Sequence, residues 1–322
     1  MRPFLIVFIL FLIGFEILIL FPKQTEKIVP PESLPMKTSS EETSQVKPQQ
    51  RMQGTQIHLV ESQSGSRDWE LFAQSAQSDP TSSTWDLKSV RTLFYNNEKQ
   101  SIVLTGDQGQ IDTQTKNMKI TGNVHIETSN GYLFIAPYVE YTSKGRLIFC
   151  SSVVQVKGPQ VDHRRSLFLK GTGMRIPVTE QKMYLDRDVS GEKIFDGDKT
   201  ITLKSDQAEL SSLNQMAQFI NHVVIHYPPM VMTGDRAMFS YSEKSHSFEY
   251  LDLTGNVELK DGDRRAVSQK LRIDMVSHQL VFSGQPRLYQ GEDELTGDQI
   301  IFIDNGKKVK VENVRLESPE GL

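Results

Sequence analysis

Apolar and polar residues alternate through most of the chain after residue 52. Val124 and Ile126 flank His125, for example, and Ala237, Phe239 and Tyr241 recur at every second position. Successive side chains of a β-strand point to opposite faces, so this period of two puts apolar residues on one face and polar residues on the other. The pattern predicts antiparallel strands with one dry and one wet face.

A second pattern marks the middle of many predicted strands. A small residue is followed there by Asp or Asn. Many of these marks, with weaker copies such as Asn221, Ser268, Gly284 and Asn313 included, are 13 or 16 residues from the next. Glycine inside a strand marks a bend or bulge, and bends at one height in successive strands would fold the sheet into two facing layers. The clearest copies are Gly106-Asp107, Gly122-Asn123, Ser205-Asp206, Gly234-Asp235, Gly255-Asn256 and Gly297-Asp298.

We therefore predict an all-β protein, built as a long antiparallel folded sheet of the β-jelly-roll kind. A parallel β-helix is the rival geometry. The tight-turn signal Asn305-Gly306 favours antiparallel hairpins, because parallel strands need longer crossovers.

The N-terminal segment has a different character. Residues 4–21 are apolar except for Glu16, and a membrane-spanning helix needs about 20 apolar residues. A signal peptide has a shorter core and ends in small residues, which Phe21-Pro22-Lys23 lacks. We predict a transmembrane anchor over residues 1–21. Glu16 either reaches the interface or contacts a partner span.

Residues 22–52 are rich in Pro, Ser, Thr, Gln, Glu and Lys and poor in aliphatic residues. Such a segment cannot bury enough apolar surface to fold, so we expect a disordered linker. The chain is then a single-pass protein of the bacterial inner membrane, with its bulk in the periplasm.

Composition and motifs exclude several classes of function. The formal net charge of −4 gives no indication of nucleic-acid binding. The single cysteine, Cys150, cannot form an internal disulfide; we expect a small buried residue, with a reactive thiol as the lesser alternative. The sequence holds no nucleophile–base motif, P-loop or metal-ligand spacing. We expect no catalytic residues, no metal and no cofactor.

Several short motifs follow one another in a recognisable order. After the apolar run and linker come Ile57-His58-Leu59-Val60-Glu61, Asp68-Trp69-Glu70-Leu71-Phe72-Ala73 and Leu169-Lys-Gly-Thr-Gly-Met-Arg175. Over about residues 1–195 the chain resembles the lipopolysaccharide-export family LptC. From about residue 200 it resembles LptA and OstA-type repeats, on Thr233-Gly-Asp-Arg-Ala237 and Leu295-Thr-Gly-Asp-Gln-Ile300. We expect an LptC-like roll over 53–195 and an LptA/OstA-like continuation over 196–322.

The resemblance implies a function in lipopolysaccharide export. Such a protein would receive lipopolysaccharide from an inner-membrane ABC transporter and pass it along a β-jelly-roll bridge to an LptA-like periplasmic partner. The alternative is an envelope scaffold or docking protein that binds no lipid. An envelope hydrolase is the third possibility, but it lacks a candidate nucleophile.

The carrier hypothesis nominates two groups of residues. Apolar side chains of the dry face would line the lipid trough, and the two terminal strands would pair with partner proteins. The trough candidates are Trp69, Phe72, Phe94, Ile111, Val124, Ile126, Val139, Tyr141, Phe239 and Val257, although each is also suited to an ordinary packed core. The edge-strand candidates are Ile57, Leu59, Val311 and Leu316.

Overall fold

The computed structural model describes residues 52–63, 65–161, 164–165, 167–194, 200–211, 216–242, 248–303 and 308–313. The predicted anchor, Glu16 and the linker up to residue 51 lie outside these residues. Within the described part of the chain, no helix is long and apolar enough to cross a membrane.

The described residues form β-strands. The first group is β1 (Met52–Gln63), β2 (Ser66–Ser78), β3 (Thr84–Asn96), β4 (Lys99–Asp112), β5 (Met118–Thr128), β6 (Leu133–Thr142), β7 (Leu147–Lys157), β8 (Gln160–Val161), β9 (Arg164–Arg165), β10 (Leu167–Pro177) and β11 (Lys182–Ile194). The second group is β12 (Thr200–Ser205), β13 (Gln207–Ser211), β14 (Met216–Tyr227), β15 (Met230–Tyr241), β16 (Phe248–Asp261), β17 (Arg264–Asp274), β18 (Gln279–Ser283), β19 (Arg287–Gln290), β20 (Asp293–Thr296), β21 (Gln299–Ile303) and β22 (Lys308–Glu312).

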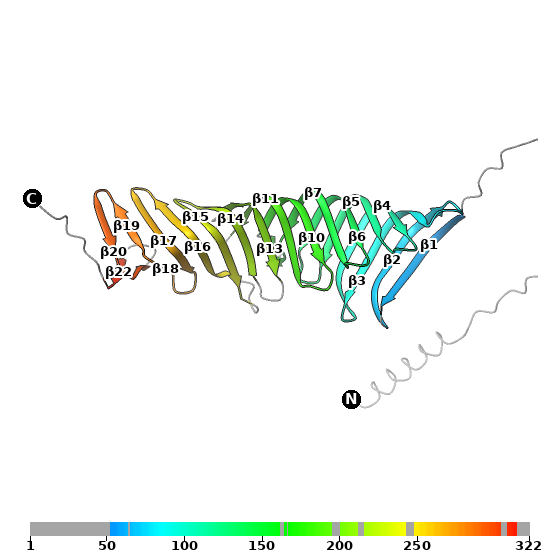
Figure 1. Cartoon of the computed structure of the whole chain (residues 1–322), viewed down its shortest axis with the longest axis horizontal. Coiled ribbons are helices and arrows are strands. Elements are labelled where there is room, and N and C mark those ends of the chain that lie inside the picture. Colours follow the sequence, from blue (N-terminus) through cyan, green and yellow to red (C-terminus); the bar gives the residue numbers. More distant parts are fainter. Residues whose placement is uncertain are drawn as a thin grey trace, which may run out of the picture. The chain divides into compact units, whose positions relative to one another are not determined.

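Twenty of these strands make one antiparallel sheet that runs from β1 to β22 (Figure 1). Most long strands pair with the strands before and after them in the chain, and β7 pairs with β10 because β8 and β9 form a separate two-stranded ribbon. Strands β18 and β19 both pair with β17, and they continue to β21 and β20 respectively. Strands β12 and β13 both pair with β11 and with β14, so they act as the two halves of one bent strand. The predicted all-β, long antiparallel sheet is confirmed.

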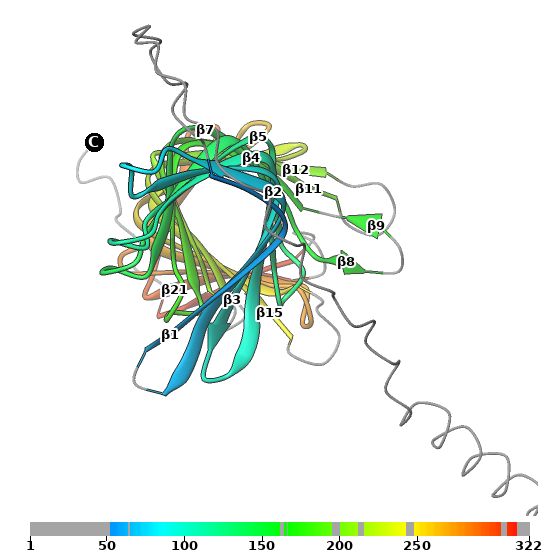
Figure 2. The ribbon, with the colours of Figure 1, turned by 90° about the vertical axis from the view of Figure 1, so that its right-hand side faces the viewer.

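The sheet winds round its own interior, as the view from the β1 end shows (Figure 2). Side chains fill this interior, and the register arranges many of them in two rows, one on each side of the bends. Row one is Leu59, Leu71, Thr92, Leu104, Ile126, Phe134, Val156, Leu169, Gly191, Leu203, Ile225, Met232, Leu259, Ala266, Leu288 and Leu295.

Row two lies on the other side of the bends. It begins with Ala76, Leu87, Gly109, Ile120 and Val139, and it continues with Cys150, Met174, Leu185, Ala208, Phe219, Ala237, Leu253, Leu271, Phe282, Ile300 and Val311. The alternation in the sequence therefore corresponds to a continuous apolar interior. Cys150 is buried within it, as predicted.

The predicted bends are register shifts in the ladder. Shifts fall between Thr121 and Val124 and between Thr254 and Val257, where the sequence has Gly-Asn. Both residues of each Gly-Asn pair have positive φ, which glycine and asparagine adopt more readily than other residues. Each asparagine amide then donates to an aspartate on the adjacent strand. These bonds are Asn123 Nδ2 to Asp107 (2.7 Å) and Asn256 Nδ2 to Asp235 (2.9 Å). Asn313, which follows Glu312, makes a similar bond from Nδ2 to Asp298 (2.8 Å).

Replacing Gly255 by Ala should lower the free energy of unfolding by about 2–4 kcal/mol. Its φ is +76°, and an added Cβ would lie 2.9 Å from the Asp235 Cβ, so strain and a clash add together. Gly262→Ala is the matched control, since Gly262 has a φ of +62° but open space around it. The control substitution should lower the free energy of unfolding by only about 1–2 kcal/mol. Urea unfolding followed by circular dichroism measures both, and equal losses would contradict the role given to the bend.

Candidate functional site

The interior of the folded sheet gathers most of the predicted trough residues. Nine of the ten are buried in one connected core: Trp69, Phe94, Ile111, Val124, Ile126, Val139, Tyr141, Phe239 and Val257. Aromatic rings contact one another within it, with 4.8 Å between the centroids of Phe94 and Tyr141 and 5.6 Å between those of Phe219 and Phe239.

Phe72 lies elsewhere. It pairs with His58 across β1 and β2, and the two rings stack with centroids 4.4 Å apart. Trp69 and Leu71 of the same strand point inward, so Phe72 lies on the outer face. Residues an odd number of positions apart on a strand point to opposite faces, so the sequence alone places Trp69 and Phe72 on different faces.

Side chains, not backbone pairs, join the two rims of the folded sheet. Among the described strands, no backbone pairing joins one rim to the other. Strands β2 and β6 are four spacings apart, about 19 Å along a flat sheet. Yet the hydroxyl of Tyr141 on β6 lies 3.3 Å from Asp68 Oδ2 on β2. This contact requires the sheet to fold back on itself, and we call the line where the rims meet the seam.

Asp68 is the centre of the contacts across the seam. Its Oδ1 lies 2.5 Å from Nη2 of Arg146, which follows β6, and the same Nη2 donates to the carbonyl of Tyr95 at 2.8 Å. The Asp68 side chain is 4% exposed. Burial raises the pKa of Tyr141 well above its usual range, and the charge of Asp68 adds to this rise. Tyr141 therefore stays a neutral donor to the carboxylate.

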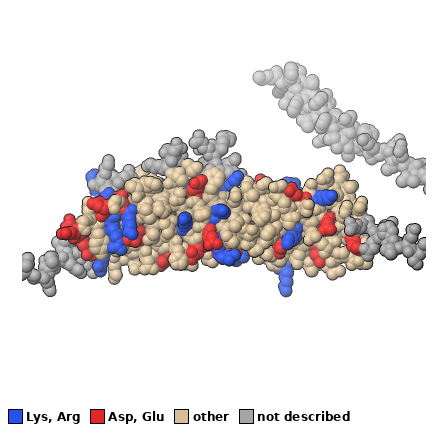
Figure 3. Space-filling model, turned by 90° about the horizontal axis from the view of Figure 1, so that it is seen from above, with Lys and Arg blue, Asp and Glu red and all other residues tan. Residues whose placement is uncertain are grey.

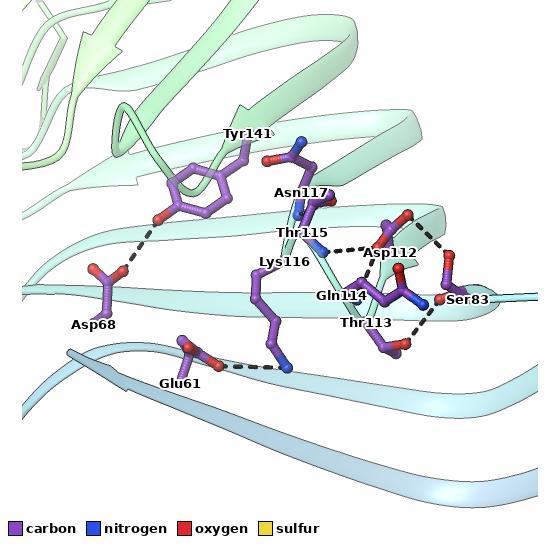
Figure 4. A network of polar contacts seen from close by, with 10 residues as sticks. All are labelled: Glu61, Asp68, Ser83, Asp112, Thr113, Gln114, Thr115, Lys116, Asn117 and Tyr141. Atoms are coloured by element: carbon purple, nitrogen blue, oxygen red, sulfur yellow. Dashed lines mark hydrogen bonds and ion pairs between the residues drawn. The ribbon is translucent and has the colours of Figure 1, made fainter.

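Two further contacts bridge the same stretch of the seam. Lys116 Nζ lies 3.6 Å from Glu61 Oε2 (Figure 4), and Asn96 Nδ2 donates to the Thr179 carbonyl at 3.1 Å. Lys116 is held by a turn in which Asp112 accepts the backbone N–H groups of Gln114 and Thr115, each at 2.8 Å. We call the contacts of Asp68, Tyr141, Arg146, Glu61–Lys116 and Asn96–Thr179 the latch.

A cation–π contact lies further along the seam. Lys193 Nζ, at the end of β11, is 4.9 Å from the ring centroid of Tyr241 at the end of β15. Burial lowers the pKa of Lys193 and raises that of Tyr241, and burial also raises the pKa of Tyr132 to about 12.

Sequence reasoning missed both the latch and an outer cavity. The cavity, of about 670 Å³, lies over β7, β10, β11, β12 and β14, and its charged or titratable lining residues are Lys157, Lys170, Glu192, Lys204 and His226. Its polar residues alternate with buried Val156 and Leu169, which places it on the outer face. No short motif predicts either feature, because each is formed by residues that lie far apart in the chain.

The two terminal strands each have one unpaired edge among the described residues. Strand β1 pairs only with β2, and β22 only with β21. The predicted edge residues Ile57, Leu59 and Val311 lie on these strands and pack partly against the core. Leu316 lies outside the described residues.

The outer face carries both signs of charge, intermingled over the view in Figure 3. Asp252 is a buried carboxylate of the outer face, and Arg272 donates to it from Nε (2.7 Å) and Nη2 (2.5 Å). Burial alone would raise the Asp252 pKa, but the bonds and charge of Arg272 lower it overall. No cluster of three metal-ligating side chains occurs among the described residues.

Two family models match the chain. A model described as "Lipopolysaccharide-assembly, LptC-related" matches residues 32–194, which is half of the chain. The protein belongs to the LptC-related family. A second model, described as "LptA/(LptD N-terminal domain) LPS transport protein", matches residues 202–308. The expected LptC family with an LptA-like C-terminal extension is thereby confirmed, and both are families of lipopolysaccharide transport.

Several solved structures match this LptC-related chain, and one of them is similar over part of it. It is the crystal structure of LptH, the LptA-homologous periplasmic component of the lipopolysaccharide transport device of Pseudomonas aeruginosa. The match has 19% identity and a TM-score of 0.32, and it covers 37% of this chain and 85% of LptH. A comparison with curated proteins gives no match.

Arg146→Ala should lower the free energy of unfolding by about 3 kcal/mol, because it leaves the buried carboxylate of Asp68 without its ion pair. Arg175→Ala is the control. Arg175 pairs with Asp186 at 2.8 Å between neighbouring strands, is half exposed, and does not cross the seam. Its loss should cost about 1 kcal/mol or less. Urea unfolding by tryptophan fluorescence measures both; equal losses would show that the latch does not hold the seam.

Proposed function

We propose that this protein is a membrane-anchored carrier of lipopolysaccharide. It receives the lipid from an inner-membrane ABC transporter and passes it along its folded sheet toward the outer membrane. Residues 1–21 anchor it as a single-pass protein of the inner membrane, with the sheet in the periplasm. The LptC-like roll over 53–195 takes the lipid first, and the continuation over 196–322 receives it next.

The apolar interior is the observation that carries this proposal. Row one pairs residue to residue from Leu59 on β1 to Leu295 on β20. Each buried CH₂ group contributes about 0.8 kcal/mol, so even partial burial of several acyl chains is strongly favourable. A continuous row offers similar sites at every step, and a lipid can therefore move along it without leaving an apolar environment.

The seam supports the same proposal. A lipid with its chains inside and its sugars in water has to cross the wall somewhere, and backbone ladders are costly to break. The contacts across the seam are few, and a partly exposed pair such as Lys116 and Glu61 is individually weak. The seam is therefore the line along which the sheet opens at least cost.

The unpaired edges of β1 and β22 support docking by strand addition. A free strand edge presents unpaired N–H and C=O groups to a neighbouring strand. In this proposal β1 faces the transporter and β22 accepts the next jelly-roll protein. A scaffold that docks partners but binds no lipid would use the same edges, so the interior is where the two functions differ.

Photocrosslinking separates carrier from scaffold. A photoreactive phenylalanine analogue at Phe94 or at Phe239 should capture lipopolysaccharide, because both side chains are buried in the interior. The same analogue at Phe72 is the matched control, since Phe72 lies on the outer face against His58. Capture should be at least about tenfold stronger from the interior positions. No capture from either, or equal capture from Phe72, would favour the scaffold.

A second photocrosslinking experiment tests strand addition at β22. A photoreactive residue at Val311 should capture an LptA-like periplasmic protein in intact cells. Val281, on an inner strand that pairs on both sides, is the control and should capture none. Capture of no jelly-roll protein from Val311 would contradict docking at this edge.

A further inference from the structure

A single polar side chain interrupts row one. As far as the described ladder runs, every other member of that row is aliphatic, aromatic, Met or Gly, but its third member is Thr92. Thr92 is fully buried between Leu71 and Leu104, and its hydroxyl has no hydrogen-bond partner among the described residues. Valine has nearly the same shape and would fill the position without this unsatisfied group.

A second unsatisfied donor lies beside it. The indole N–H of Trp69 is also buried without a hydrogen-bond partner among the described residues. Trp69 pairs with Phe94, two positions along β3 from Thr92, so the two residues are diagonal neighbours on one interior face. Diagonal neighbours in an antiparallel pair are roughly 7 Å apart, within reach of one bound group.

Unmade hydrogen bonds of this kind are costly in the empty protein. A buried polar group without a partner bears its full desolvation penalty, and the great majority of such groups in folded proteins are satisfied. Two adjacent donors in an otherwise apolar interior therefore point to a missing acceptor. The acceptor has to be neutral, because an unpaired anion buried among these apolar side chains would cost far more.

The position indicates which acceptor fits. Trp69 directly follows Asp68, the centre of the latch, so the donors lie inside the wall beside the seam. A lipid that crosses the seam places there the junction of its acyl chains with its head group. That junction carries ester or amide carbonyls, which are neutral acceptors.

We propose that Trp69 and Thr92 bind an acyl-linkage carbonyl of the lipid and so fix how deeply its chains enter the first roll. This inference rests on the proposed carrier function and names the part of the lipid that the site recognises. The apolar rows bind chains of any kind, whereas these two donors favour an acylated lipid over an alkyl one. A site built to hydrogen-bond a group discriminates against analogues that lack it.

Thr92→Val tests the inference, because stability and affinity should respond differently. The variant removes an unsatisfied hydroxyl, so the unfolding midpoint should stay the same or rise. Its affinity for purified lipopolysaccharide should fall about fivefold, the worth of one ordinary hydrogen bond. Thr92→Ser keeps the hydroxyl and should retain most of the affinity. Trp69→Phe provides a second, independent loss of a donor.

A pair of lipids tests the class of acceptor. The native protein should bind di-ester phosphatidylglycerol several-fold more tightly than the di-ether lipid of equal chain length, and Thr92→Val should reduce that preference. If Thr92→Val is destabilised but binds lipid with native affinity, the hydroxyl is an ordinary structural or water-bonding group. That result would overturn the inference. If the native protein binds none of these lipids, the carrier function itself fails, and the inference fails with it.

Discussion

The bends in the strands are the constraint on which the rest of the molecule depends. Strands of 10 to 14 residues, such as β4 and β6, would form a flat sheet with one face exposed if they ran straight. The shift between Thr121 and Val124 and its counterparts turn the sheet back on itself, so that both halves of each strand bury the same face. The two apolar rows and the seam all follow from that turn, and the pairs of Asn and Asp hold it locally.

The sequence predicts much of this, because bend chemistry and alternation are local properties. Gly122-Asn123 supplies two positive φ angles and an amide donor within two residues, and both properties follow from the residue types themselves. The alternation predicts the nine interior residues correctly. It would also have excluded Phe72, because Phe72 lies an odd number of positions from Trp69 on the same strand. The latch and the outer cavity depend on how far the sheet curls, and no local signal records this. Asp68 and Tyr141 are 73 residues apart and meet only because three intervening strands curve between them.

The nature of the seam connects the fold with the function proposed for it. A barrel closed by backbone hydrogen bonds would resist opening along its whole length. Here the rims meet through Arg146, Lys116 and Asn96, whose contacts break one at a time. The carboxylate of Asp68 makes the closed state specific, because it is buried and depends on Arg146 for its pairing. Under the proposed function, such a wall would be stable when empty and could still open to admit an acyl chain.

The joining of two transport families within one ladder bears on how a lipid would pass between them. Strand β11 ends the segment that matches LptC, and it pairs directly with β12 and β13, where the LptA-like match begins. Leu169, Gly191 and Leu203 carry row one across this boundary without a gap. Two separate proteins would have to align their edges before a lipid could cross. In this chain covalent continuity fixes the register. Under the proposed function, the first transfer would therefore require no docking step, and docking would occur at the free edge of β22.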